Sequence, residues 1–124
     1  MKCQGNYTGE LPTLNVVKEG KVHRIYFNYE ESQTIIDGEE EQSPLPSFVC
    51  DLIEIDELTY PSIVSAIVRD RYSQNDVEAI ISNYQLCKDG KAGEDRCIRY
   101  EEDYNAYQDY RAMAKQVANQ IINL

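Results

Sequence analysis

The segment LTYPSIVSAIVRDRYSQNDVEAIISNY, residues 58–84, decides the fold that the sequence predicts. Thr59 followed by Pro61 is typical of a helix start, because the Thr hydroxyl can accept from a free backbone N–H and proline tolerates the first turn. Apolar residues then recur at three- and four-residue spacing, which predicts an amphipathic helix. At Ser73 the pattern restarts with a capping box closed by Asp76. The segment therefore predicts two consecutive short helices.

The residues before this segment predict a small acidic sheet. Residues 14–18, 22–29 and 47–55 are rich in β-branched and aromatic side chains, and the first two runs are separated by a short turn containing glycine. We therefore expect residues 13–57 to form the β part of the chain. Residues 1–12, with two glycines and a proline, are expected to form a flexible arm.

The residues after the segment predict one long amphipathic helix, from about Arg96 to Ile122. The predicted fold class is α+β: a small antiparallel sheet of about three strands followed by a helical hairpin and a long C-terminal helix. We expect one domain over residues 1–124, with its helical part at 58–124.

The charge of the chain argues against nucleic-acid binding. The formal net charge is −10, and residues 1–58 carry 12 acidic against 4 basic residues. Two consecutive helices invite comparison with a helix-turn-helix protein, but such proteins contact phosphates through Lys and Arg. The second predicted helix has neither residue between Ser73 and Cys87. A helical hairpin that packs within its own domain is the better interpretation.

The sequence predicts no catalytic residue, no metal site and no cofactor. His23 is the only histidine and lies inside a predicted strand, where a structural role is usual. Cys87 and Cys97 flank a loop and can pair under oxidising conditions, but thiols are expected in a reducing compartment, and no further zinc ligand is recognisable at a suitable spacing. We predict that the protein is not an enzyme.

The residues predicted to contact a partner fall into two groups. Tyrosine suits interfaces and half-buried faces because it combines a large apolar ring with a polar tip, although core packing is the commoner role. The acidic run near residue 40 lacks the spacing of a calcium loop, which favours a solvated surface that can face a basic protein. The candidate partner-binding residues are Tyr100, Tyr104, Tyr107, Tyr110, Glu39, Glu40 and Glu41.

Several positions in the helical half resemble small uncharacterised proteins encoded among the structural genes of prophages and phage-like elements of gut anaerobes. They include Tyr60, residues 63–69, Tyr72-Ser73, Asn83-Tyr84 and the Arg111/Lys115 pair. Tyr110 stands where that pattern has Trp, and the sheet has no counterpart in it. The resemblance implies an accessory or assembly role associated with phage particles and transfers no catalytic residue.

The leading hypothesis for function is a non-enzymatic protein-interaction module, with phage or prophage assembly as its setting. A first alternative is an acidic inhibitor that mimics nucleic acid and occupies a basic groove, and a second is a small enzyme with a pocket near His23. No apolar run reaches the length of a membrane span and the first residues lack a signal-peptide core. We therefore expect a protein of the cytoplasm, or of a phage particle assembled there, that binds neither membrane nor nucleic acid. A homo-oligomer is compatible with the sequence.

Overall fold

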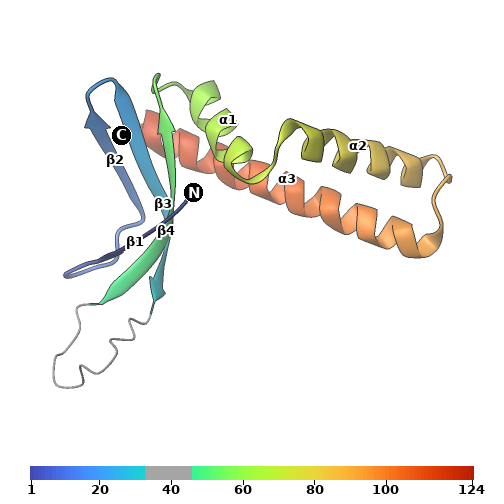
Figure 1. The fold of residues 1–124 in the computed structure, drawn as a ribbon, viewed down its shortest axis with the longest axis horizontal. Coiled ribbons are helices and arrows are strands. Elements are labelled where there is room, and N and C mark those ends of the chain that lie inside the picture. The colour runs from blue at the N-terminus through green and yellow to red at the C-terminus, as the bar shows by residue number, and fades with distance from the viewer. Residues whose placement is uncertain (33–45) are drawn as a thin grey trace. The chain divides into compact units, whose positions relative to one another are not determined.

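The structure is a computed structural model that describes residues 1–32 and 46–124. The described residues form four strands and three helices in an α+β arrangement, as the sequence predicted (Figure 1). The chain forms two compact units, Met1–Glu57 and Leu58–Leu124. Within the described residues, no helix has the length and apolar character needed to cross a membrane.

The first unit is a four-stranded antiparallel sheet with the strand order β1-β4-β3-β2. Its strands are β1 (Lys2–Asn6), β2 (Leu14–Glu19), β3 (Val22–Ser32) and β4 (Ser47–Ile55). The last three lie where the sequence predicted them. Gly20, at a positive φ of 62°, makes the tight turn between β2 and β3.

The prediction of a flexible arm at residues 1–12 is wrong for Lys2–Asn6, which forms β1. This strand pairs with β4 in a register that places Cys3 opposite Cys50 and Gly5 opposite Phe48. The sequence KCQGN carries little β propensity of its own, so the strand depends on pairing with β4. Among the described residues the sheet consequently has four strands rather than about three.

The buried side chains of the sheet come from its two central strands. Ile25 and Phe27 of β3 and Cys50 of β4 are almost completely buried, and Leu52 and Ile53 of β4 are nearly so. Because the consecutive residues Leu52 and Ile53 of β4 are both buried, both faces of this strand are covered in part.

The second unit contains α1 (Tyr60–Arg71), α2 (Gln74–Lys88) and α3 (Glu94–Ile122). The predicted caps are present. At the start of α1 the Thr59 side chain accepts a hydrogen bond from the backbone N–H of Ser62. At the start of α2, Ser73 and Asp76 form the reciprocal capping box. The helix α3 begins two residues earlier than the predicted Arg96.

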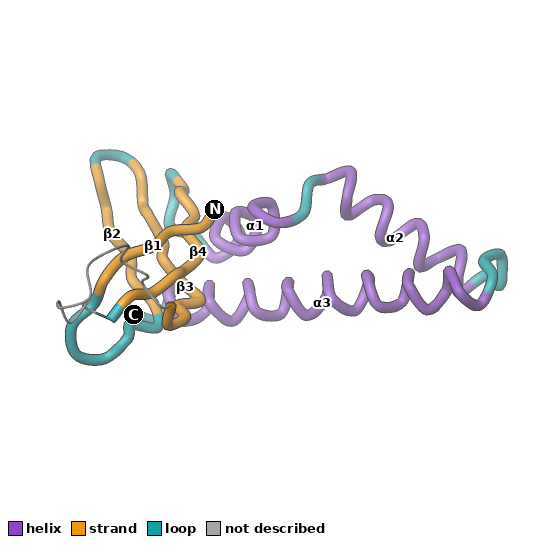
Figure 2. The backbone as a smooth tube through the Cα atoms, turned by 60° about the horizontal axis from the view of Figure 1, so that its bottom comes forward, coloured by secondary structure: helices purple, strands orange, loops and turns teal. Residues whose placement is uncertain are grey.

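Both α1 and α2 pack along α3, and α2 lies antiparallel beside the N-terminal half of α3 (Figure 2). The helical hairpin of the structure is therefore α2 with α3, whereas the sequence suggested α1 with α2. Residues 73–105, which comprise α2, the connecting loop and the first part of α3, are called the α2–α3 hairpin below.

Cys87 and Cys97, whose pairing the sequence left open, form a disulfide across the end of the α2–α3 hairpin. Their Cα atoms are 5.2 Å apart, within the usual range for a disulfide. The expectation of two free thiols is therefore corrected. The thiols that remain free are those of Cys3 and Cys50.

Candidate functional site

The four predicted tyrosines all lie on α3, but they have different surroundings. Tyr107 is 7% exposed, and its ring meets that of Tyr72 edge-on at 5.1 Å, so it belongs to the core of the helical unit. Tyr110 is half-buried, 5.7 Å from the same Tyr72 ring, and the guanidinium of Arg71 lies 4.9 Å from its centre. Tyr110 therefore keeps part of its surface accessible to a partner, whereas Tyr107 does not.

Tyr104 packs against the neighbouring helix of the hairpin. Its ring stacks on that of Tyr84 with centroids 3.8 Å apart and planes 2° from parallel. The Lys88 ammonium lies 5.1 Å from the Tyr84 ring on the same helix. The pKa of Lys88 is raised, mainly by its hydrogen bond to Tyr84 and also by neighbouring charges that include Glu101. Tyr104 therefore joins α2 to α3, while Tyr100, one turn earlier, is half-buried.

The other group of predicted residues, Glu39, Glu40 and Glu41, lies outside the described residues. His23, the residue considered for an enzyme, stands in β3 between Lys18 of β2 and Ile55 of β4.

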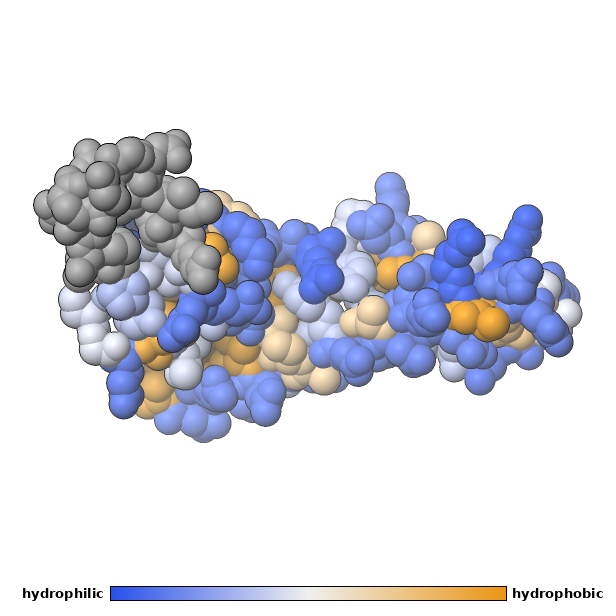
Figure 3. Space-filling view, turned by 90° about the horizontal axis from the view of Figure 1, so that it is seen from below, coloured by the Kyte–Doolittle hydropathy of each residue, from blue (hydrophilic) through white to orange (hydrophobic). Residues whose placement is uncertain are grey.

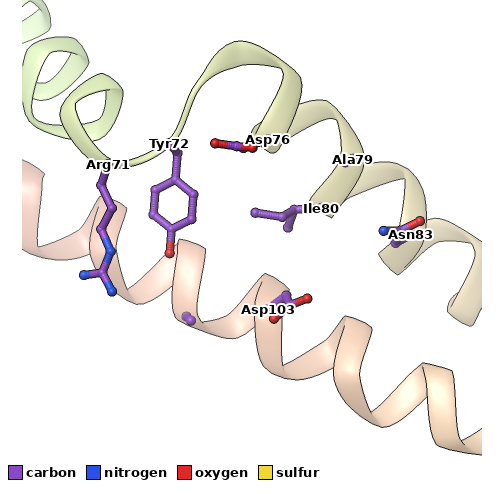
Figure 4. A pocket seen from close by; sticks show the side chains of 8 residues that line it. Arg71, Tyr72, Asp76, Ala79, Ile80, Asn83 and Asp103 are labelled. Carbon is purple, nitrogen blue, oxygen red and sulfur yellow. The ribbon is translucent and has the colours of Figure 1, made fainter.

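An open hollow of about 470 Å³ lies in the helical unit next to Tyr72. Figure 4 shows its lining: Arg71 ends α1 and Tyr72 follows it, Asp76, Ile80 and Asn83 belong to α2, and Asp103 belongs to α3. Hydrogen bonds from the backbone and side chain of Ser73 lower the pKa of Asp76, so its carboxylate is charged but already serves as a helix cap. The hollow can accept a protruding basic or amide side chain and is too open to enclose a small substrate.

The α2–α3 hairpin exposes apolar surface. None of the residues of α2, all of which are described, is buried. Ile81 is 48% exposed, Leu86 42% and Ile98 58%. Figure 3 shows apolar surface on this part of the molecule among hydrophilic side chains. An amphipathic helix normally buries its apolar stripe, so α2 has more apolar surface than α3 alone covers.

Sequence reasoning missed one cluster, at the disulfide. Sγ of Cys87, Sγ of Cys97 and a carboxylate oxygen of Glu101 all lie within 4.8 Å of one another. Cys97 and Glu101 are four residues apart on α3 and therefore share a helix face, a spacing that the sequence displays. That Cys87 faces the same point depends on the pairing of α2 with α3, which was not predicted.

Comparisons of the chain with protein-family models, with curated proteins and with solved structures found no match.

Proposed function

We propose that the chain is a non-enzymatic protein-interaction module that binds its partner through the α2–α3 hairpin. The observation that carries this proposal is that α2 buries none of its residues while Ile81, Leu86 and Ile98 stay substantially exposed. Exposed apolar surface rimmed by polar residues is characteristic of protein-binding sites. The resemblance of the helical half to phage-associated proteins makes a component of a phage or prophage particle the expected partner.

The charge of the hairpin favours a basic rim on that partner. Residues 73–105 contain eight acidic and four basic residues. The hollow beside Tyr72 is lined by the carboxylates of Asp76 and Asp103 and by one cation, Arg71, so a lysine or arginine of the partner would meet a net negative charge there. Apolar contacts at Ile81 and Ile98 would provide affinity, while the acidic rim would direct orientation and the rate of association.

The experiment is affinity capture from a lysate of phage-producing source cells, with the retained proteins released in salt steps and identified by mass. Three forms are compared: the unmodified chain, the double variant Ile81→Glu with Ile98→Glu, and Ile122→Glu as a matched control. Ile122 is 46% exposed but lies at the far end of α3, outside the hairpin. We expect phage structural proteins on the unmodified chain and on the control, resistant to moderate salt and lost from the double variant.

Two outcomes would contradict the proposal. Equal retention by the double variant would place the contact elsewhere on the chain. Retention only of DNA-binding proteins that dissociate at modest salt would instead support the nucleic-acid mimic, because such binding depends mainly on charge.

A further inference from the structure

The cluster at the end of the α2–α3 hairpin contains the types of ligand that zinc prefers. The cluster consists of the sulfurs of Cys87 and Cys97 and a carboxylate oxygen of Glu101, which come from two helices. It is the group of three potential metal ligands found among the described residues. Thiolate sulfur and carboxylate oxygen are both common zinc ligands. In the oxidised chain the sulfurs are bonded to each other, so the cluster can bind a metal only after reduction.

The distances fit a tetrahedral ion. With Zn–S near 2.3 Å and Zn–O near 2.1 Å, a tetrahedral site places a sulfur and an oxygen ligand about 3.6 Å apart and two sulfurs about 3.8 Å apart. An oxygen of Glu101 already lies 3.5 Å from Sγ of Cys87. The two sulfurs need only separate after reduction, and both cysteines are half-buried, so rotation about their side-chain bonds can provide this separation.

The exposure and charge of the site also suit an ion. Glu101 is exposed and both cysteines are half-buried, so an ion can enter and water can reach a fourth position. Two thiolates and one carboxylate carry three negative charges, which a Zn²⁺ ion and the nearby ammonium of Lys88 would balance.

We propose that reduced Cys87 and Cys97, together with Glu101, bind one Zn²⁺ ion, with a water molecule as the fourth ligand. The disulfide and the ion are then alternative links between the same two helices, selected by the redox state of the surroundings. The proposal concerns a site of its own and does not depend on the identity of any protein partner.

The reduction step has a defined balance. A water-soluble trialkylphosphine transfers two electrons to the disulfide and is oxidised to its phosphine oxide, while water supplies the oxygen atom and the two thiol protons. Binding of the metal then releases those two protons as the thiolates form.

The test uses the full chain carrying Cys3→Ser, which removes one thiol of the other potential pair. The chain is reduced with the phosphine, desalted without oxygen and titrated with Co²⁺ as a spectroscopic probe. We expect one Co²⁺ per chain, with thiolate-to-cobalt charge-transfer absorption and the visible bands of a tetrahedral ion, both lost when Zn²⁺ displaces the cobalt. The oxidised chain should show neither signal.

Matched variants assign the ligands. Glu101→Gln should weaken Co²⁺ binding by about tenfold or more, while Glu102→Gln, at the adjacent exposed position on another face of α3, should leave it unchanged. Cys87→Ser should abolish the charge-transfer band, with circular dichroism confirming that the helices persist. The proposal is overturned by the absence of the band in the reduced chain, by its survival in Cys87→Ser, or by equal affinity in Glu101→Gln and the unmodified chain.

Discussion

At the scale of the residue, Tyr107 shows how the tyrosines of α3 divide between core and surface. Its ring is nearly buried against Tyr72, whereas Tyr110 and Tyr104 remain half-exposed. Tyr107→Ala should lower the free energy of unfolding by about 3–5 kcal/mol, as aromatic truncations in cores do. Tyr107→Phe, which keeps the ring, should cost much less. Urea denaturation measures both, and a loss below about 1 kcal/mol for the alanine variant would contradict a core role.

The thiol of Cys50 gives the sheet a defined sensitivity to alkali. Burial, with a smaller contribution from Cys3, raises the pKa of Cys50 from 9.0 to about 11. Above pH 9 the unfolded chain therefore loses this proton before the folded chain does, and stability falls as the pH rises from 9 toward 11. Burial likewise raises the pKa of Tyr29 to about 12, which acts in the same direction.

Cys50→Val removes one of these two groups and should make the decline of stability between pH 9 and 10.5 less steep. Urea midpoints measured at several pH values for the variant and the unmodified chain provide the comparison. The same slope in both would show that Cys50 ionises equally easily in the folded and unfolded states.

At the scale of the element, β1 depends on the absence of a side chain at Gly5. A Cβ there would come within 2.8 Å of the ring of Phe48, which is itself packed against Tyr29 at 5.0 Å and Tyr7 at 6.3 Å. Gly5→Val should therefore destabilise the chain by about 1–3 kcal/mol through overpacking. Gln4→Val, at the exposed neighbouring position of the same strand, should change stability by less than about 0.5 kcal/mol. Equal effects of the two substitutions would mean that β1 does not dock as described.

The elements that the sequence predicted are those with strong local signals. The capping box at Ser73, the proline at position 61 and the turn at Gly20 each mark a boundary that the structure confirms. By contrast, Lys2–Asn6 has no apolar alternation and becomes a strand only because β4 offers a free edge. The pairing of α2 with α3 was missed for a related reason: apolar periodicity shows that a helix has a buried face but does not identify what covers it.

The same limit applies to the candidate sites. The cysteines and Glu101 are visible in the sequence, but their convergence depends on two helices separated by a loop. The tyrosines were located on their helix, whereas the division between Tyr107 in the core and Tyr110 near the surface depends on Tyr72 from outside α3.

At the scale of the whole molecule, we predict that stability is unequal along α3. Its C-terminal half contains four buried side chains, Ala114, Val117, Ala118 and Ile121, whereas its N-terminal half pairs with a helix that has none. Local opening free energies follow buried apolar contacts. Backbone amides of α2 and of α3 before Tyr104 should therefore exchange with solvent faster than those near Ala118.

Reduction of the Cys87–Cys97 disulfide without added metal should increase that difference, because it frees the end of the hairpin. Amide hydrogen exchange of the full chain before and after reduction measures the effect. Unchanged exchange in α2 would mean that the disulfide does not restrain the hairpin.

Hydrogen exchange in the presence of a captured partner is the most direct test of binding through the α2–α3 hairpin. The full chain is compared alone and bound, with exchange resolved along the sequence. We predict new protection across the α2–α3 hairpin, greatest around Ile81 and Ile98, where exposed apolar side chains become covered. Protection confined to residues 1–32 and 46–57, with α2 unchanged, would contradict it and would move the binding surface to the sheet.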